Sequence, residues 1–180
     1  MIYVLLANGF EEIEALAPVD LLRRAEKQVL IAGVGGKEIS STRGVKIITD
    51  IEVSEIELSE NLEMIVLPGG LPGKDNLETS EKVIEAIKYC AGNNVFIASI
   101  CAAPSIIGKM GLLSGKRATC YNGFEKFLEG AEILDDAVVA DGKFITGKGA
   151  GSSIEFALKL VEVLCGAESA EKMSKTLQCS

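Results

Sequence analysis

The stretch VFIASICAAPSIIG, residues Val95–Gly108, joins an apolar run of strand length to small residues that are compatible with a helix. Cys101 stands at the corner between the two segments. Proline costs about 3 kcal/mol inside a helix but is tolerated in the first turn, where a backbone N–H has no intrahelical partner. Pro104 therefore predicts a helix that begins at or next to Cys101.

Outward from this corner, strand and helix signals alternate along the whole chain. Buried strands are predicted at residues 2–8, 28–34, 63–70, 95–100 and 116–120. Helices are predicted at 11–26, at 80–91 with Ser80 as N-cap, and at 152–164, where Ser152 and Glu155 have the spacing of a capping box. Hairpins are predicted at 38–51 and 138–147. This series predicts a single-domain α/β protein with a doubly wound, mostly parallel sheet and helices on both faces.

Composition limits the partners of this domain. Hydrophobic residues make up 48% of the 180 residues and mean hydropathy is +0.29, which favours a sheet covered on both faces. The net charge of −8 argues against nucleic acid and anionic membranes as partners. No apolar run reaches the roughly 18 residues of a membrane span, and the chain opens on a strand instead of a basic leader. A reducing, cytoplasmic setting is expected.

The cysteine and histidine contents limit which metal sites and catalytic mechanisms the chain can have. Five cysteines form no CxxC pair, so they indicate neither a disulfide framework nor a zinc site. The chain has no histidine, which excludes Ser-His, Cys-His and His-metal mechanisms.

Cys101 is the first candidate for chemistry. A thiol at a helix N-terminus faces free N–H groups and the positive end of the helix dipole, which favour the thiolate. The alternative is that Cys101 is a small buried hydrophobe, the reading that also suits Cys90, Cys165 and Cys179.

Glu14 is the second candidate. Helical spacing puts Ala17, Pro18 and Leu21 on its face, and a carboxyl on an apolar stripe tends to be protonated. Pro18 cannot donate to the carbonyl of Glu14, so a local break of the helix is expected there. Alternatively, Pro18 begins a second helix and Glu14 lies in a solvated turn.

Two weaker candidates are a glycine turn and an arginine. The turn LPGGLPG, residues 67–73, lets backbone N–H groups approach a ligand, as an oxyanion hole requires, although an ordinary tight turn fits equally well. Arg43 could bind an anion or could simply be solvated. Residues 142–149 have the glycine spacing of a phosphate loop, but Gly149 replaces the required Ser or Thr, so no nucleotide site is expected.

Several motifs in one order make the chain resemble the ThiJ/PfpI superfamily, in the branch of the Parkinson-disease-linked DJ-type protein and its bacterial relatives. The motifs are GFEEIEALAPVDLLRRA, STRGVKI, IVLPGGLPG, ASICAAPSIIG, GKRATCY and DGKFITGKGAGSSIEFALKLVE. The resemblance implies that residues 1–180 form one flavodoxin-like domain of the class I glutamine amidotransferase-like type. It also implies a homodimer that uses no cofactor and no metal.

The resemblance further implies roles for single residues. Cys101 falls on the family's reactive nucleophile, and Glu14 falls on the protonated acid that hydrogen-bonds it. The remaining matches are Gly70 and Ala102 for the oxyanion-hole N–H groups, and Arg24 and Arg43, with Asp20 nearby, for an anion site at the dimer interface.

Two departures from the family pattern limit this transfer. Protease-like members carry histidine directly after the cysteine, and Ala102 at that position argues against peptide hydrolysis. Tyr121 stands where some glyoxalase-competent members have histidine. A tyrosine can orient a substrate oxygen, but its pKa of about 10 makes it a poor base at neutral pH. Proton transfer would then rest on Glu14 and water.

Two functions remain open at this point. The favoured one is cofactor-free conversion of a small 2-oxoaldehyde such as methylglyoxal to a hydroxy acid, with a related deglycase activity on early glycation adducts. The alternative is a redox-sensing or chaperone-like stress protein that uses the same cysteine without turnover. Cys120, expected at a strand end in the same sheet, could resolve an oxidised Cys101 as a disulfide or could be a packed strand thiol.

Overall fold

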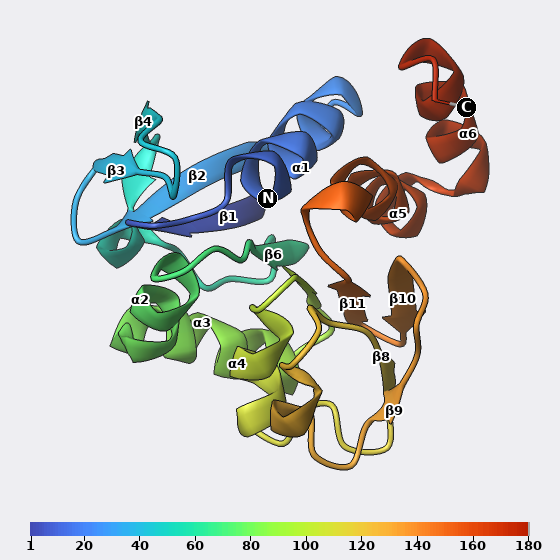
Figure 1. The fold of residues 1–180 in the computed structure, drawn as a ribbon. Helices are drawn as coiled ribbons and strands as arrows, with labels where there is room; N and C mark the ends of the chain where they lie inside the picture. Colours follow the sequence, from blue (N-terminus) through green and yellow to red (C-terminus); the bar gives the residue numbers. More distant parts are fainter. Residues whose placement is uncertain (180) are drawn as a thin grey trace.

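A computed structural model describes residues 1–179, and at its centre lies a seven-stranded sheet in the order β10-β11-β7-β6-β1-β2-β5 (Figure 1). All neighbouring pairs are parallel except β10 with β11. The strands are β1 Ile2–Ala7, β2 Val29–Val34, β5 Ile51–Glu52, β6 Met64–Leu67, β7 Phe96–Ile100, β10 Val138–Asp141 and β11 Phe144–Gly147.

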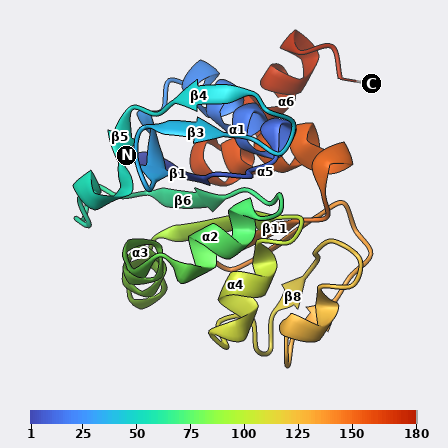
Figure 2. The same cartoon turned by 60° about the vertical axis from the view of Figure 1, so that its left-hand side comes forward.

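Helices cover both faces of this sheet, and each face has its own apolar core. Figures 1 and 2 place α1 Glu12–Arg24 and α5 Ser153–Cys165 on one side, with α6 Ala167–Thr176 packed against α5. On the other side lie α2 Gly73–Thr79, α3 Glu81–Gly92 and α4 Pro104–Lys109. Every residue of β1 and β6 is buried, because a central strand in such a sandwich has no solvent side. The predicted single-domain, mostly parallel α/β fold is confirmed.

Short elements complete the chain. An antiparallel hairpin of β3 Glu38–Ser40 and β4 Lys46–Ile48 forms a separate two-stranded sheet, as the polar sequence of residues 38–51 predicts. A second small sheet pairs β8 Arg117–Ala118 with β9 Glu132–Ile133. Three single-turn 3₁₀ helices are η1 Val53–Glu55, η2 Glu125–Phe127 and η3 Ala150–Ser152.

Three local expectations are wrong. The helix after the Cys101 corner begins at Pro104, three residues later than predicted, because a turn occupies residues 101–103. The capping box of α5 does not form, since the Ser152 hydroxyl donates to the carbonyl of Gly149 at 2.8 Å. Residues 116–120 do not join the main sheet, so Cys120 follows a strand of the small β8–β9 sheet.

Pro18 also behaves differently from the expected break. α1 continues through it from Glu12 to Arg24, so neither the break nor a second helix is present. Pro18 is buried, and the flanking Ala17 and Val19 belong to the core between α1 and the sheet. The packing of this buried face keeps the helix continuous although proline removes one of its hydrogen bonds.

The strand order fixes where a ligand can bind. The chain proceeds from β1 to β2 and β5 on one side, and then continues with β6 and β7 on the other side of β1. The switch point therefore lies between β1 and β6, at their carboxyl ends. The segments that follow β1, β6 and β7 meet there, and they carry Glu14, the Gly69–Gly70 turn and Cys101.

Candidate active site

Cys101 occupies a sharp turn directly after β7. Its φ of +65° lies in the left-handed region, which a residue with a side chain adopts at a cost of about 1–3 kcal/mol. Hydrogen bonds to two neighbouring segments hold this conformation: Cys101 N–H donates to the carbonyl of Gly147 at 2.9 Å, and Tyr121 N–H donates to the carbonyl of Cys101 at 2.8 Å. A strained turn of this kind lifts a side chain out of the sheet, as nucleophile elbows do. The thiol is partly exposed.

Glu14 reaches the same place from the first turn of α1. Glu11 caps that turn through its carboxylate, which accepts from the N–H of Glu14 at 2.8 Å. The Glu14 side chain is fully buried, and its Oε2 accepts from the N–H of Gly69 at 2.8 Å. Within residues 1–179, the buried Oε1 has no hydrogen-bond partner. A buried oxygen in this condition is expected to carry a proton or to meet a ligand.

Gly69 separates the thiol from the carboxyl. A Cβ at position 69 would lie 2.6 Å from Glu14 Oε2 and 2.7 Å from Cys101 Cβ, so only glycine leaves room for the two side chains to meet. Both side chains border this space, and each shifts the pKa of the other. The Glu11 N–H in turn donates to the carbonyl of Gly69 at 3.0 Å, which ties the turn after β6 to the start of α1.

Two backbone N–H groups, those of Gly70 and Ala102, are near enough to the Cys101 sulfur to lower its pKa. Gly70 has φ +89°, and a Cβ there would lie 2.5 Å from the N–H nitrogen of Glu11, so this turn also requires glycine. Neither N–H donates to another backbone carbonyl within residues 1–179. Both are therefore free to hold an oxyanion formed at a carbon bound to the sulfur.

The protonation of Cys101 differs from the expectation that free N–H groups and the helix dipole favour its thiolate. α4 is six residues long and starts three residues after Cys101. Burial first, and then the charge and hydrogen bond of Glu14, raise the pKa of the Cys101 thiol to about 12, although the N–H groups of Ala102 and Gly70 act to lower it. Burial likewise raises the pKa of Glu14 to about 7, although its hydrogen bonds to Cys101 and Gly69 act to lower it. The thiolate is therefore less disfavoured when Glu14 holds a proton than when Glu14 is charged.

This raised carboxyl pKa predicts how stability depends on pH. Below the ordinary pKa of 4.5, Glu14 is protonated in both the folded and the unfolded chain. Between pH 4.5 and about 7 the folded chain binds more protons than the unfolded chain, so stability falls as pH rises. Relative to a Glu14→Gln variant, the wild type should lose on the order of 3 kcal/mol of unfolding free energy between pH 5 and pH 8. Urea unfolding of both proteins at the two pH values measures this difference, and equal losses would contradict a buried acid.

The two arginines lie apart from the thiol. Arg24 ends α1, about 20 Å along the helix axis from its start at the site. Its guanidinium is exposed and pairs with Asp20 at 2.9 Å. Arg43 is exposed in the β3–β4 turn, where its N–H donates to Glu12 at 3.0 Å. Neither reaches Cys101 within one chain, so their assigned place at a dimer interface stays a prediction.

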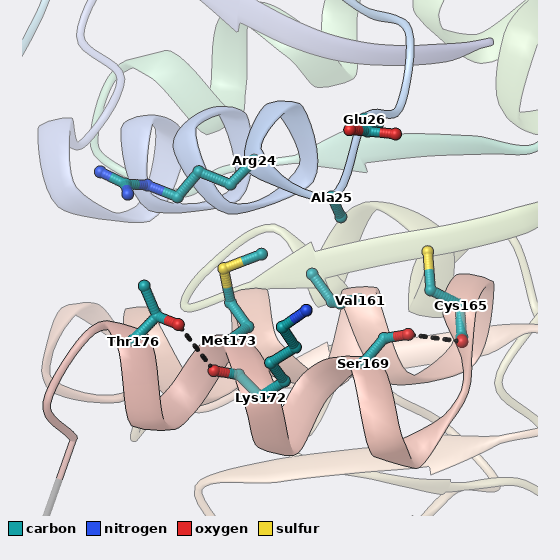
Figure 3. Close-up of a pocket in the computed structure, with 9 residues that line it drawn as sticks. All are labelled: Arg24, Ala25, Glu26, Val161, Cys165, Ser169, Lys172, Met173 and Thr176. Atoms are coloured by element: carbon teal, nitrogen blue, oxygen red, sulfur yellow. Dashed lines mark hydrogen bonds between the residues drawn. The ribbon is translucent and has the colours of Figure 1, made fainter.

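Arg24 borders a cavity of about 550 Å³ between the end of α1 and the helices α5 and α6. Figure 3 shows Lys172 and Met173 of α6 pointing toward α1, with Cys165 at the far end of the cavity. This cavity is not part of the candidate site, because its walls are helix ends remote from the carboxyl ends of β1, β6 and β7.

Tyr121 and Cys120 follow β8. Tyr121 is 53% exposed and lines a cavity of about 460 Å³ together with Lys148, Gly149 and Glu155. Tyr121 contributes to the candidate site through its backbone, because its N–H donates to the carbonyl of Cys101. Cys120 is buried in the core on the α3–α4 side, and burial raises its pKa to about 12, so the structure favours the packed strand thiol over a resolving cysteine.

Sequence reasoning missed Gly69 and Gly147 as parts of this site. Gly69 gives the space between thiol and carboxyl, and Gly147 accepts the hydrogen bond that fixes the elbow. The double glycine in LPGGLPG is the signal that could have identified Gly69. Among residues 1–179, no cluster of three or more metal-ligating side chains is found. In the same part of the chain, no helix is long and apolar enough to cross a membrane.

Comparison with known proteins gives relatives along nearly the whole chain. The Parkinson disease protein 7 homolog of Danio rerio is 38% identical over 178 residues, which cover 97% of this chain and 94% of that protein. The glutathione-independent glyoxalase DJR-1.2 of Caenorhabditis elegans is 35% identical over 169 residues, covering 93% and 89%. Protein DJ-1 homolog B of Arabidopsis thaliana is 38% identical over 97% of this chain, which spans 40% of that longer protein.

Solved structures agree. Drosophila melanogaster DJ-1beta superposes with a TM-score of 0.93 at 36% identity, covering 99% of this chain and 97% of that one. Toxoplasma gondii DJ-1, in an oxidized state, superposes with a TM-score of 0.93 at 34% identity, covering 98% and 97%. The profile of the DJ-1/PfpI family matches residues 1–163. Because the profile spans most of the chain and these relatives share more than a third of its residues, the chain belongs to the DJ-1/PfpI family.

Proposed function

We propose that the protein converts small 2-oxoaldehydes such as methylglyoxal to 2-hydroxy acids without a cofactor. One observation carries this proposal: a thiol and a fully buried carboxyl meet across Gly69, with the N–H groups of Gly70 and Ala102 at the sulfur. This set contains a nucleophile, a proton carrier and an oxyanion hole. The C. elegans relative named as a glutathione-independent glyoxalase supports the choice of substrate.

The first step forms a carbon–sulfur bond. With its proton held by Glu14, the Cys101 sulfur attacks the aldehyde carbon, and the carbonyl electron pair moves onto oxygen. The N–H groups of Gly70 and Ala102 hold this oxyanion. Glu14 then gives its proton to that oxygen, which leaves a neutral hemithioacetal and a carboxylate whose raised pKa makes it a competent base near neutral pH.

The second step moves hydrogen between the two substrate carbons. The Glu14 carboxylate removes the proton from the sulfur-bearing carbon while the ketone oxygen takes up a proton from water, which gives an enediol. Glu14 then returns its proton to the neighbouring carbon while the hydroxyl on the sulfur-bearing carbon loses its proton to water. The former aldehyde carbon becomes a thioester and the former ketone becomes an alcohol, so no external oxidant or reductant is needed. Water then hydrolyses the thioester, which releases lactate and restores the thiol.

We also propose that the protein forms a homodimer through α1 and the β3–β4 hairpin. Ile13 and Leu16 on α1 and Val45 and Ile48 in the β3–β4 hairpin are exposed apolar side chains, and the hairpin is joined to the start of α1 by the Ser41–Glu12 hydrogen bond. A partner over this surface would bury these side chains and would bring a second Arg43 toward the interface. Five free thiols suit the cytoplasmic setting that we also propose.

A second function deserves a direct comparison because Cys101 is a partly exposed thiol next to a proton carrier, whereas Cys90 and Cys120 are buried. Peroxide would then reach Cys101 before Cys90 and Cys120, and a redox sensor further requires that Cys101 react before the partly exposed Cys165 and the exposed Cys179. We expect methylglyoxal to yield lactate at a rate proportional to protein concentration, without glutathione or added metal. In a parallel sample, peptide mass mapping after peroxide treatment locates the oxidised cysteine. Oxidation at Cys101 with no lactate would favour the sensor and overturn the enzyme.

A further inference from the structure

A buried ammonium group lies one helical turn beyond the oxyanion-hole glycine. Lys74, near the start of α2, has a side chain only 4% exposed, and its N–H donates to the carbonyl of Gly70 at 2.8 Å. A lysine is almost never buried to this extent unless its charge is paired. The sequence pattern gave no indication of it, because residue 74 stands in a polar run after LPGGLPG.

The Lys74 ammonium has several partners. Its Nζ lies 2.7 Å from Asp75 Oδ1 and 2.7 Å from Glu78 Oε2, and the second oxygen of Glu78 lies 2.5 Å from Lys109 Nζ on α4. Burial lowers the pKa of Lys74, but the hydrogen bonds and charges of Asp75 and Glu78 outweigh it and raise the pKa above its ordinary value. The group is therefore a permanent cation, and its partner Glu78 joins α2 to Lys109 of α4, the helix after the Cys101 elbow.

The same ammonium faces the loop that carries Tyr121. It lies 6.0 Å from the ring centre of Phe124, and Lys109 lies 4.7 Å from the ring centre of Phe127. Phe124 packs edge-on against Tyr121 with ring centres 6.5 Å apart, and its N–H donates to the carbonyl of Tyr121 at 3.0 Å. The Lys74–Glu78–Lys109 chain of charges thus contacts α4 and the loop of residues 121–127, and the backbone of Lys74 contacts the Gly70 turn.

We propose that Lys74 is a positioning residue for the candidate site: its ion pair with Glu78 holds the N–H of Gly70 against the sulfur and holds the loop of residues 121–127 beside the Cys101 elbow. The expected effect of Lys74 on turnover rests on the proposed function. Its expected effect on the position of the Gly70 N–H next to Cys101 does not, because it can be measured without a substrate. Since displacement of an aligned donor by about 1 Å is costly, a loosened turn should lower kcat more than it raises KM.

The test variant is Lys74→Met, which keeps the length and apolar stem of the side chain. Glu78 keeps Lys109 as its partner, so no buried carboxylate is left unpaired. We expect lactate formation to fall roughly tenfold or more, chiefly in kcat. We also expect the pH profile of Cys101 alkylation by iodoacetamide to move upward by about half a unit or more, because the Gly70 N–H lowers the pKa of this thiol. The titratable groups that act on the sulfur in the wild type, Glu14 and beyond it Glu11, are unchanged in the variant.

Three further proteins complete the experiment. Lys74→Arg should restore most of both properties, because a guanidinium can still pair with Glu78. Glu78→Gln should shift the alkylation profile in the same direction, which covers the case of a Lys74→Met protein that does not fold. Lys82→Met is the matched control, since it removes an exposed ion pair with Glu85 on α3 and should change neither readout.

The outcomes separate the two proposals. A lower melting temperature with an unchanged alkylation profile and unchanged kcat would show that Lys74 only stabilises the fold, which overturns the positioning role. A shifted alkylation profile in a protein whose wild type forms no lactate would support the positioning role while refuting the proposed enzyme. If the wild type forms lactate and Lys74→Met changes neither readout, the proposed enzyme is supported and the positioning role of Lys74 is refuted.

Discussion

Replacement of Cys101 by serine should reduce lactate formation from methylglyoxal by at least about a thousandfold. Serine is nearly isosteric with cysteine and keeps the hydrogen bonds of the backbone to Gly147 and Tyr121, so the elbow should remain folded. Its hydroxyl, however, needs a strong base to become a nucleophile, and the chain has no histidine to supply one. Glu14, with a pKa of about 7, matches a thiol far better than an alcohol.

The measurement is the initial rate of lactate formation by equal amounts of folded protein, with unfolding temperature recorded for each variant. Cys165→Ser is the matched control, because Cys165 is also a partly exposed thiol but ends α5, away from the carboxyl ends of the central strands. Its rate should equal that of the wild type. Substantial lactate formation by Cys101→Ser would remove the covalent mechanism altogether.

The fold was predictable where elements are long or carry a strong local signal. The apolar runs that became β1, β2, β6 and β7 are strands because a sheet covered on both faces requires apolar residues throughout. The Asp141-Gly142 pair fixed the β10–β11 hairpin in the same way. Segments of two or three residues, such as β5 and β9, have no periodicity to detect. Their pairing depends on neighbours that are remote in sequence.

The site was predictable in its members but only partly in its electrostatics. A thiol at a strand–helix corner, a glutamate on an apolar helical face and a double glycine each point to chemistry on their own. The sequence does not predict how deeply the thiol and the carboxyl are buried next to each other. Burial raises the pKa of Cys101, whereas the free N–H groups and helix dipole inferred from the sequence predicted a lowered pKa. The cation at Lys74 was missed for the same reason, since its burial depends on the loop of residues 121–127 packing over α2.

Replacement of Glu14 by glutamine should lower lactate formation by about a hundredfold or more. The amide keeps the shape of the side chain and an oxygen for the N–H of Gly69, so the hydrogen bond at 2.8 Å can persist. It cannot accept a proton from the hemithioacetal carbon or return one to the neighbouring carbon. The rate of lactate formation measures this loss, and Glu12→Gln is the matched control in the same turn, where the carboxylate binds Ser41 and Arg43 in the hairpin.

Alkylation of the same variant distinguishes the two roles that Glu14 could have. In the wild type, the charge of Glu14 raises the pKa of Cys101, so its removal should make the thiol easier to ionise. We therefore expect Glu14→Gln to react with iodoacetamide at pH 7 at least as fast as the wild type, while lactate formation falls. If Glu14→Gln loses both alkylation and lactate formation, the Glu14 carboxyl serves only to support the Cys101 thiolate. Retention of lactate formation would exclude Glu14 as the proton carrier and would leave water as the only remaining carrier between the two carbons.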